Sequence, residues 1–143
     1  MPDILHDLTI EGSLESVFRS VSTPPGLNQW WTLTSEGEPK PDALFRLNFG
    51  PGYEWHARVT AYEPDKLIEF VMIQADPDWV HTRVRFEISE RGNLTRLRFS
   101  HLGWSESSDH FRTSSYCWAM YLRILRRYVE MGETVPYEDR LSA

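Results

Sequence analysis

The sequence predicts an α+β fold in which a curved antiparallel sheet of about six strands wraps around a long carboxy-terminal helix. Three observations predict it. Apolar residues alternate with a period of two across residues 43–101, turn signals recur at short intervals within that stretch, and a helical period replaces the alternation after residue 107. The length of 143 residues is typical of one domain, so we expect a single domain over residues 1–143.

The amino-terminal segment predicts one strand followed by two short helices. Residues 4–10 alternate, with Ile4, His6, Leu8 and Ile10 on the side expected to face the core. Ser13 can cap a helix whose apolar residues follow the i, i+3, i+4, i+7 spacing until the pair Pro24 and Pro25 ends it. A second helical turn is expected to hold Leu27, Trp30 and Trp31.

The alternating pattern of residues 43–101 predicts five antiparallel strands in which each strand is followed by its neighbour in the sheet. Residues directly opposite one another in an antiparallel pair share a face of the sheet, so each turn fixes a register. The turns at Gly50 to Gly52, Pro64-Asp65 and Gly92-Asn93 place apolar pairs on one face. The expected pairs are Leu47 with Trp55, Phe45 with Ala57, Ala57 with Met72, Val59 with Phe70, Ala61 with Ile68, Phe86 with Phe99, Ile88 with Leu97, and Val84 with His101. The other face collects charged residues, with Glu87 opposite Arg98.

The last predicted element is a helix from about residue 107 to residue 131. Ser107 or Ser108 can cap it and Gly132 can end it. At 1.5 Å per residue, about 24 residues give roughly 36 Å, which is enough to cross the sheet. Its expected inward side is Phe111, Ser115, Trp118, Leu122, Leu125 and Val129.

Three stretches carry a resemblance to a known family: the residues 14–18 leading to Trp30-Trp31, the end of the last strand at residues 101–104, and the spacing from Trp118 to Gly132. Together they resemble the START-like or SRPBCC superfamily, which shares the birch-pollen-allergen helix-grip fold. Within it, the chain is similar to the branch of activator of heat shock protein 90 ATPase homologues. The resemblance implies a cavity between the final helix and the sheet, used across the superfamily for lipids, sterols, polyketides and plant hormones.

Composition disfavours several classes of function. A formal net charge of −6 and a pI near 5.3 disfavour nucleic-acid binding, which needs a basic footprint. Cys117 is the single cysteine, so no intramolecular disulfide forms, and no Cys/His spacing indicates a metal site or a cofactor. The amino terminus is polar and no apolar run approaches the roughly 20 residues that span a bilayer, so a cytoplasmic protein is expected.

The inward face predicts the residues of a binding pocket. The small Ala57 and Ala61 leave room among large rings, although the helix could instead fill that room. The ligand-binding candidates are Trp30, Trp31, Phe45, Trp55, Phe70, Phe86, Phe99, His101, Trp118 and Tyr121. Trp79, in a turn beside Pro77, is expected to be an exposed ring that gates the mouth or meets another subunit.

Three functions remain open on the sequence alone. The first is binding of a small hydrophobic or amphipathic molecule, which we favour over catalysis. The second is a cyclase, dehydratase or hydrolase that uses His101 as a general base, although a histidine at the core edge bonded to a backbone carbonyl fits that position as well. The third is a co-chaperone-like or self-associating module, such as a homodimer, with an apolar patch near Trp79 or Tyr137; the absence from this sequence of the eukaryotic activators' additional amino-terminal domain disfavours the co-chaperone.

Overall fold

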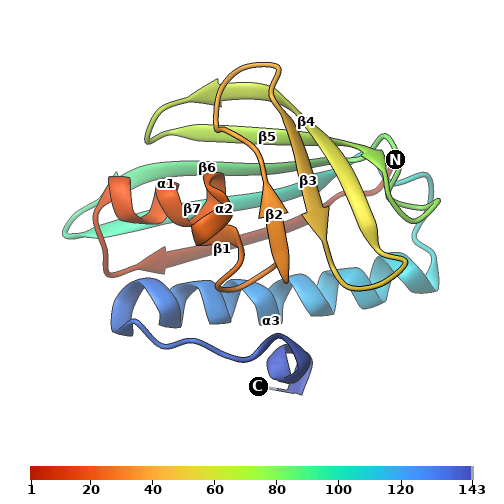
Figure 1. Cartoon of the computed structure of the whole chain (residues 1–143). Helices are drawn as coiled ribbons and strands as arrows, with labels where there is room; N and C mark the ends of the chain where they lie inside the picture. Colours follow the sequence, from red (N-terminus) through yellow and green to blue (C-terminus); the bar gives the residue numbers. More distant parts are fainter. Residues whose placement is uncertain (143) are drawn as a thin grey trace.

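The computed structural model describes residues 1–142, and its main feature is a strongly curved sheet with one long helix lying along it (Figure 1). The seven strands are all antiparallel and run in the order β1-β7-β6-β5-β4-β3-β2. The strands are β1 (Ile4–Ile10), β2 (Thr34–Glu36), β3 (Leu44–Asn48), β4 (Glu54–Glu63), β5 (Leu67–Gln74), β6 (Arg83–Arg91) and β7 (Leu94–Leu102). The helices are α1 (Leu14–Ser22), α2 (Pro24–Leu27), α3 (Asp109–Met131) and the 3-10 helix η1 (Tyr137–Ser142).

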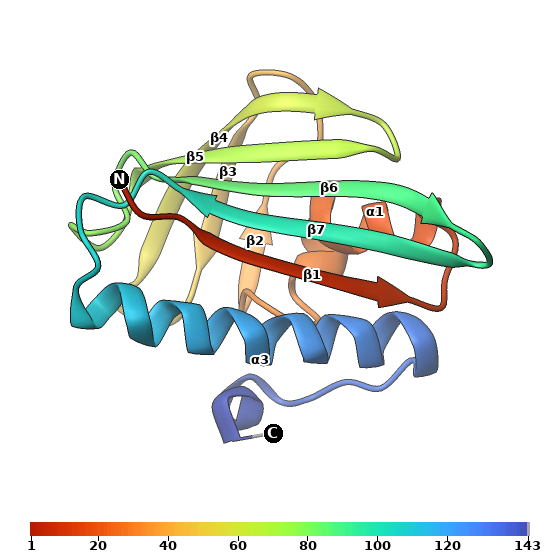
Figure 2. The ribbon, with the colours of Figure 1, turned by 180° about the vertical axis from the view of Figure 1, so that it is seen from behind.

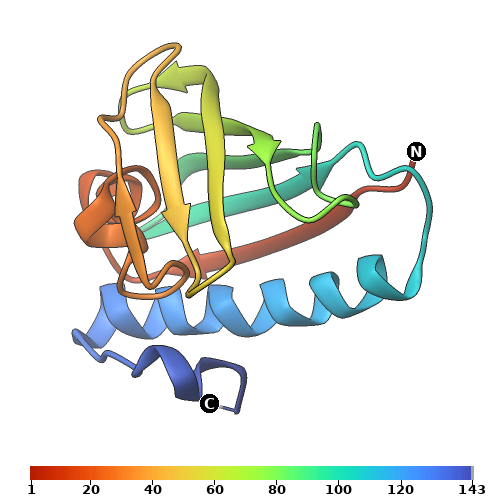
Figure 3. The ribbon, with the colours of Figure 1, turned by 45° about the vertical axis from the view of Figure 1, so that its right-hand side comes forward.

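The helices occupy three places around this sheet. Helices α1 and α2 sit within its curve at one end, where α1 packs against β5 and β6 (Figure 1). Helix α3 runs beside β1, as the view from behind shows (Figure 2). The segment that carries η1 folds back along the side of α3 that faces away from the strands (Figure 3). The predicted α+β helix-grip architecture is therefore confirmed.

The sheet contains one strand more than the expected six. Strand β2 is only three residues long and pairs Ser35 with Leu47 at the edge of the sheet. So short a strand shows no alternation of apolar and polar residues, and its sequence Thr-Ser-Glu has no apolar residue to reveal a buried face.

The predicted register is confirmed at the first and last hairpins and partly wrong in the middle one. Phe45 pairs with Ala57, and Val84 pairs with His101, as expected. Between β4 and β5, however, Ala61 lies opposite Glu69 and not opposite Ile68, because the register shifts between residues 59 and 61. The turn holds residues 64–66 between its last paired residues, one more than predicted. Ala61 therefore leaves the inner face, and the bulky Tyr62 takes its place opposite Ile68.

The ends of the helices follow ordinary capping chemistry. Of the two cap candidates for α3, Ser108 is the one used, and its hydroxyl accepts a hydrogen bond from the backbone N–H of Phe111 at 3.2 Å. Gly132 ends the helix in the left-handed conformation, with φ of 67°. On the inward side Ser114 is buried, whereas the expected Ser115 is half-buried.

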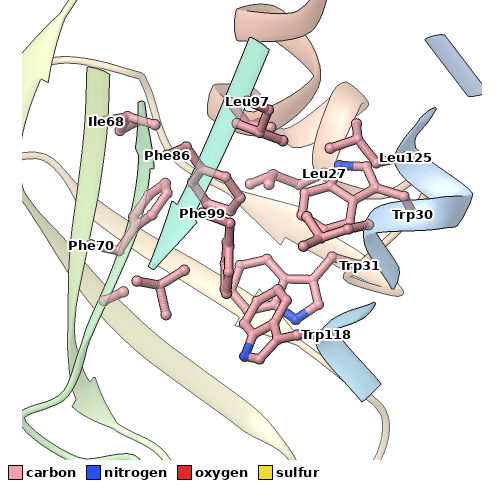
Figure 4. Packing of buried hydrophobic residues seen from close by; sticks show 14 of the residues in the cluster. Leu27, Trp30, Trp31, Ile68, Phe70, Phe86, Leu97, Phe99, Trp118 and Leu125 are labelled. Carbon is pink, nitrogen blue, oxygen red and sulfur yellow. The ribbon is translucent and has the colours of Figure 1, made fainter. Parts of the chain in front are cut away.

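Large rings fill the space between α3, α2 and the central strands (Figure 4). The ring of Phe99 lies 4.4 Å from that of Trp118 and 5.4 Å from that of Phe86, measured between centroids. Trp30 meets Phe86 edge-on at 5.9 Å, and its indole N–H donates to the carbonyl of Ser20 at 2.8 Å. This part of the interior is therefore a packed core.

No helix of the described residues is both long enough and apolar enough to cross a bilayer.

Candidate functional site

A pocket of about 390 Å³ opens at the other end of the interior, beside the first half of α3. Its walls come from five places: the turn after α2, the β3–β4 hairpin, the loop between β5 and β6, α3, and η1. Its volume lies within the range of small-molecule sites. The lining residues are Trp31, Phe49, Tyr53, Trp55, Asp76, Trp79, His110, Thr113, Ser114, Cys117, Trp118, Tyr121, Tyr137 and Leu141.

The walls are mainly aromatic, and five of the lining rings contact one another in a closed circuit. Measured between centroids, Trp31 and Phe49 are 5.5 Å apart, and Phe49 and Trp55 are 5.0 Å apart. Trp79 then lies 5.1 Å from Trp55 and 5.8 Å from Trp118. Trp118 closes the circuit at 5.0 Å from Trp31. Because each ring is held by two others, this aromatic circuit is preformed in the absence of a ligand.

The carboxy-terminal segment forms one wall and is fixed by a buried arginine. The guanidinium of Arg140 donates to three backbone carbonyls, those of Val135, Thr32 and Asn28, at 3.2, 3.1 and 2.7 Å. The phenol of Tyr137 donates to the carbonyl of Phe49 at 3.0 Å. Burial lowers the pKa of Arg140, since no carboxylate among the described residues pairs with it. The guanidinium thus clamps η1 to the turn that follows α2.

Few polar groups reach the pocket, and the free charge among them is negative. Asp76 is half-buried, and within residues 1–142 its carboxylate has neither a hydrogen bond nor an ion pair. His110 contacts Asp78, with 3.0 Å between Nδ1 and Oδ2. No lysine or arginine is among the lining residues that the structure describes.

Two weak acids on α3 stay protonated at neutral pH. Burial raises the pKa of the Cys117 thiol, so the thiol is less reactive than an exposed cysteine. Burial, with a contribution from Tyr137, raises the pKa of Tyr121 to about 12. The same pocket holds no cluster of His, Cys, Asp or Glu suited to a metal ion, as far as the described residues extend.

His101, the candidate general base, lies under the pocket wall and not in the pocket. The indole N–H of Trp118 donates to its Nδ1 at 3.0 Å, which fixes Nδ1 as an acceptor. The proton of the neutral ring is then on Nε2, 2.8 Å from the hydroxyl oxygen of Thr82, and that hydroxyl donates to the carbonyl of Trp79. Burial, together with repulsion from His110, lowers the pKa of His101 to about 3. Both ring nitrogens are engaged, so the side chain has no free lone pair to offer a substrate.

The structure divides the residues proposed from the sequence into two groups. Trp31, Trp55, Trp118 and Tyr121 line the pocket. The others are fully buried and lie outside it: Trp30, Phe45, Phe70, Phe86, Phe99 and His101. Trp30 and Trp31 lie in the turn after α2, and the others share the inner face of the sheet or of α3. The alternation of inward and outward residues does not show which of these lie at the packed end and which at the open end.

Trp79 differs from the sequence expectation of an exposed ring. Only 7% of it is exposed, because the loop that carries it folds back on itself. The Trp79 N–H donates to the carbonyl of Asp76, and the N–H of His81 donates to that of Met72. The indole N–H of Trp79 reaches the hydroxyl of Ser114 at 3.4 Å. Trp79 is thus a wall of the pocket and not a surface gate.

The framework that carries this pocket is shared with a known family. Residues 11–130 match the family model described as Activator of Hsp90 ATPase homolog 1-like protein. The chain belongs to this family. The match confirms the resemblance seen in the sequence. It ends before Tyr137 and Leu141, so the carboxy-terminal wall of the pocket lies outside the part matched to the family.

Several solved structures share the fold of this chain. The solution structure of the Aha1 dimer from Colwellia psychrerythraea is 28% identical, covers 93% of this chain and 99% of its own, and has a TM-score of 0.85. CalU16 from Micromonospora echinospora is 20% identical over 98% of this chain and 81% of its own, with a TM-score of 0.76. A Staphylococcus saprophyticus protein is 18% identical over 94% of this chain and 96% of its own, with a TM-score of 0.80. No curated protein matches the chain.

Proposed function

We propose that this protein binds a small hydrophobic or amphipathic molecule in the pocket beside α3. The observation that carries the proposal is the aromatic circuit, which leaves a space of about 390 Å³ beside a core that is otherwise closely packed. A preformed concave space walled mainly by aromatic rings is the kind of site that accepts an apolar ligand.

The chemistry of the lining favours binding over catalysis. The lining thiol and the Tyr121 phenol are held in their protonated forms, and His101 is locked in internal hydrogen bonds. General acid-base catalysis needs a group that can exchange a proton near neutral pH and reach the substrate. His101 does not reach the pocket and therefore acts as a structural residue that orients Trp118. The histidine that does line the pocket, His110, is engaged at Nδ1 with Asp78, so binding remains the function that we propose for this pocket.

Native mass spectrometry of gently purified protein tests this function, together with thermal shift against fatty acids, sterols and aromatic polyketides. A ligand at about one hundred times its Kd stabilises the folded state by about 2.7 kcal/mol, which shifts the melting temperature by several degrees. The variant Cys117→Trp fills the pocket from α3, and Ala119→Trp adds the same bulk on the exposed side of that helix. We expect only Cys117→Trp to abolish the shift while its circular dichroism spectrum stays native. Equal loss in both variants, or no ligand from any class, would contradict the proposal.

Self-association is a second candidate, because the Colwellia psychrerythraea structure is that of a dimer. This chain exposes large apolar side chains on several outer elements, among them Leu5 on the edge strand β1. Light scattering on a size-exclusion column tests it directly. A concentration-dependent mass that Leu5→Lys abolishes would support a dimer through β1, and a monomer at all concentrations would refute it.

A further inference from the structure

The sign of the charge in the pocket restricts the ligand further than its apolar character does. The aromatic circuit presents rings whose faces carry partial negative charge. Asp76 adds a full negative charge that no partner among the described residues neutralises. Among the lining residues described, none is a lysine or an arginine. Both features attract a cation, and neither suits a carboxylate or a phosphate.

From this arrangement we infer that the ligand is an organic cation, whose substituted ammonium group lies against the rings of the aromatic circuit and is balanced by Asp76. The inference rests on the proposed function and names the class of molecule that the same pocket takes. Cation–π attraction is strongest with tryptophan, and four of the five rings in the circuit are indoles.

The hydrogen-bonding groups of the pocket favour a methylated ammonium over a primary one. A primary ammonium has three N–H donors, each of which needs an acceptor once water is removed. The hydroxyl of Ser114 already accepts from Trp79, and His110 is engaged with Asp78. The free anionic acceptor is the single carboxylate of Asp76. A tertiary or quaternary ammonium leaves at most one donor to satisfy, so its desolvation costs less in this pocket.

The remainder of the ligand is apolar. Tyr121, Tyr137 and Leu141 extend the lining beyond the aromatic circuit. The guanidinium of Arg140 lies behind this wall, 5.3 Å from the centroid of the Tyr137 ring, so the ammonium is expected beside Asp76 and the uncharged part of the ligand here. The neutral rings of Tyr121 and Tyr137 can pack against alkyl or aryl groups. We therefore expect the part of the ligand next to the ammonium to be alkyl or aromatic. The inferred ligand is therefore amphipathic, with its charge at the end that meets Asp76.

Three probes of the same shape and different charge test the inference: phenyltrimethylammonium, its neutral carbon isostere tert-butylbenzene, and the anion benzenesulfonate. Binding is followed by NMR through the indole N–H signals of the lining tryptophans, at a mildly alkaline pH where histidine side chains are neutral. We expect the cation to bind about tenfold tighter than the neutral isostere, with the anion weakest. Added salt should weaken the binding of the cation and leave that of the neutral probe unchanged.

Matched variants separate the two contributions. Asp76→Asn should reduce the affinity for the cation about tenfold and leave the affinity for the neutral isostere unchanged. The control Asp65→Asn removes the same charge from a half-buried turn residue outside the pocket lining, at φ of 63°, a conformation that asparagine also adopts, and should change neither affinity. If the neutral isostere binds as tightly as the cation, or if Asp76→Asn changes nothing, the inference is overturned while the pocket remains a binding site. If none of the three probes binds, the inference is overturned as well, and the broader ligand panel then decides the proposed function separately.

Discussion

Acidification is expected to destabilise this protein through His101. In the folded state the ring is buried, neutral and engaged at both nitrogens, and its pKa is lowered from 6.5 to about 3. Below about pH 6.5 His101 is protonated in the unfolded chain but stays neutral in the folded chain. The contribution of neutral His101 to the free energy of unfolding is therefore fully present above that pH and is lost as the pH falls toward 3. Each pKa unit corresponds to 1.36 kcal/mol, so the loss between about pH 6.5 and pH 4 is roughly 3 kcal/mol.

Urea denaturation followed by tryptophan fluorescence at several pH values measures this loss. The variant His101→Gln is the informative comparison, since glutamine can both accept from Trp118 and donate to Thr82 but does not titrate. We expect it to be less stable than the wild type by about 1–2 kcal/mol at neutral pH, because two buried hydrogen bonds lose their ideal geometry. Below pH 6.5 its stability should fall less steeply than that of the wild type. The control His81→Asn changes an exposed histidine at φ of 72°, which asparagine tolerates, and should keep the wild-type slope.

The result that would refute this reasoning is a parallel loss of stability in the wild type and in His101→Gln. Asp7, which forms a salt bridge with Arg96, also makes the stability depend on pH, but it does not affect the comparison between the wild type and His101→Gln. Its hydrogen bond with Arg96 lowers its pKa below the ordinary value of 3.8, so its contribution is lost at more acidic pH and in both proteins alike. A parallel loss would mean that protonated His101 finds a partner inside the fold.

Three further changes test how the frame of the pocket is held. Gly26→Ala would place a Cβ 2.5 Å from a backbone carbonyl oxygen of α1, so we expect a loss of about 1–3 kcal/mol in thermal unfolding, and an unchanged melting temperature would contradict the close approach of α1 and α2. Arg140→Met removes three hydrogen bonds to backbone carbonyls, so hydrogen exchange in η1 should become at least about tenfold faster, whereas the exposed Arg123→Met should leave it unchanged. Ser108→Ala should cost about 1 kcal/mol through loss of the cap of α3, and Ser107→Ala should cost little; equal losses would show that the wrong cap had been assigned.

The sequence was informative about the sheet because alternation and turn chemistry act over short distances. The pair Phe86 and Phe99 follows from the turn at Gly92-Asn93 alone, and the structure has it. The pairing of Ala61 failed because a loop one residue longer with a bulge satisfies the same Pro64-Asp65 signal. One added residue reverses the face of its neighbours, so the room expected beside Ala61 is taken by Tyr62.

The position of the pocket could not be obtained in this way. The alternation of inward and outward residues along the strands assigns Phe99 and Trp55 to the same inner face. Phe99 is nevertheless buried in the core, whereas Trp55 lines the pocket. The difference depends on which end of the sheet α1 and α2 cover, and on where η1 returns. These are long-range contacts: the phenol of Tyr137 bonds to the carbonyl of Phe49, 88 residues away. No local pattern in the sequence records such a contact.

Trp118 joins the core and the pocket, and this makes their behaviour interdependent. One side of its ring packs on Phe99 in the core, and the residue also contributes to the aromatic circuit around the pocket. Its orientation depends on the hydrogen bond that its indole N–H donates to His101. Protonation of His101 would place an N–H on Nδ1, facing the indole N–H of Trp118. Two donors cannot share a hydrogen bond, so the Trp118 ring would lose this restraint. The acid response of the fold and the preorganisation of the pocket therefore depend on the same hydrogen bond, and a ligand that packs against Trp118 should bind most tightly at the pH values where His101 is neutral.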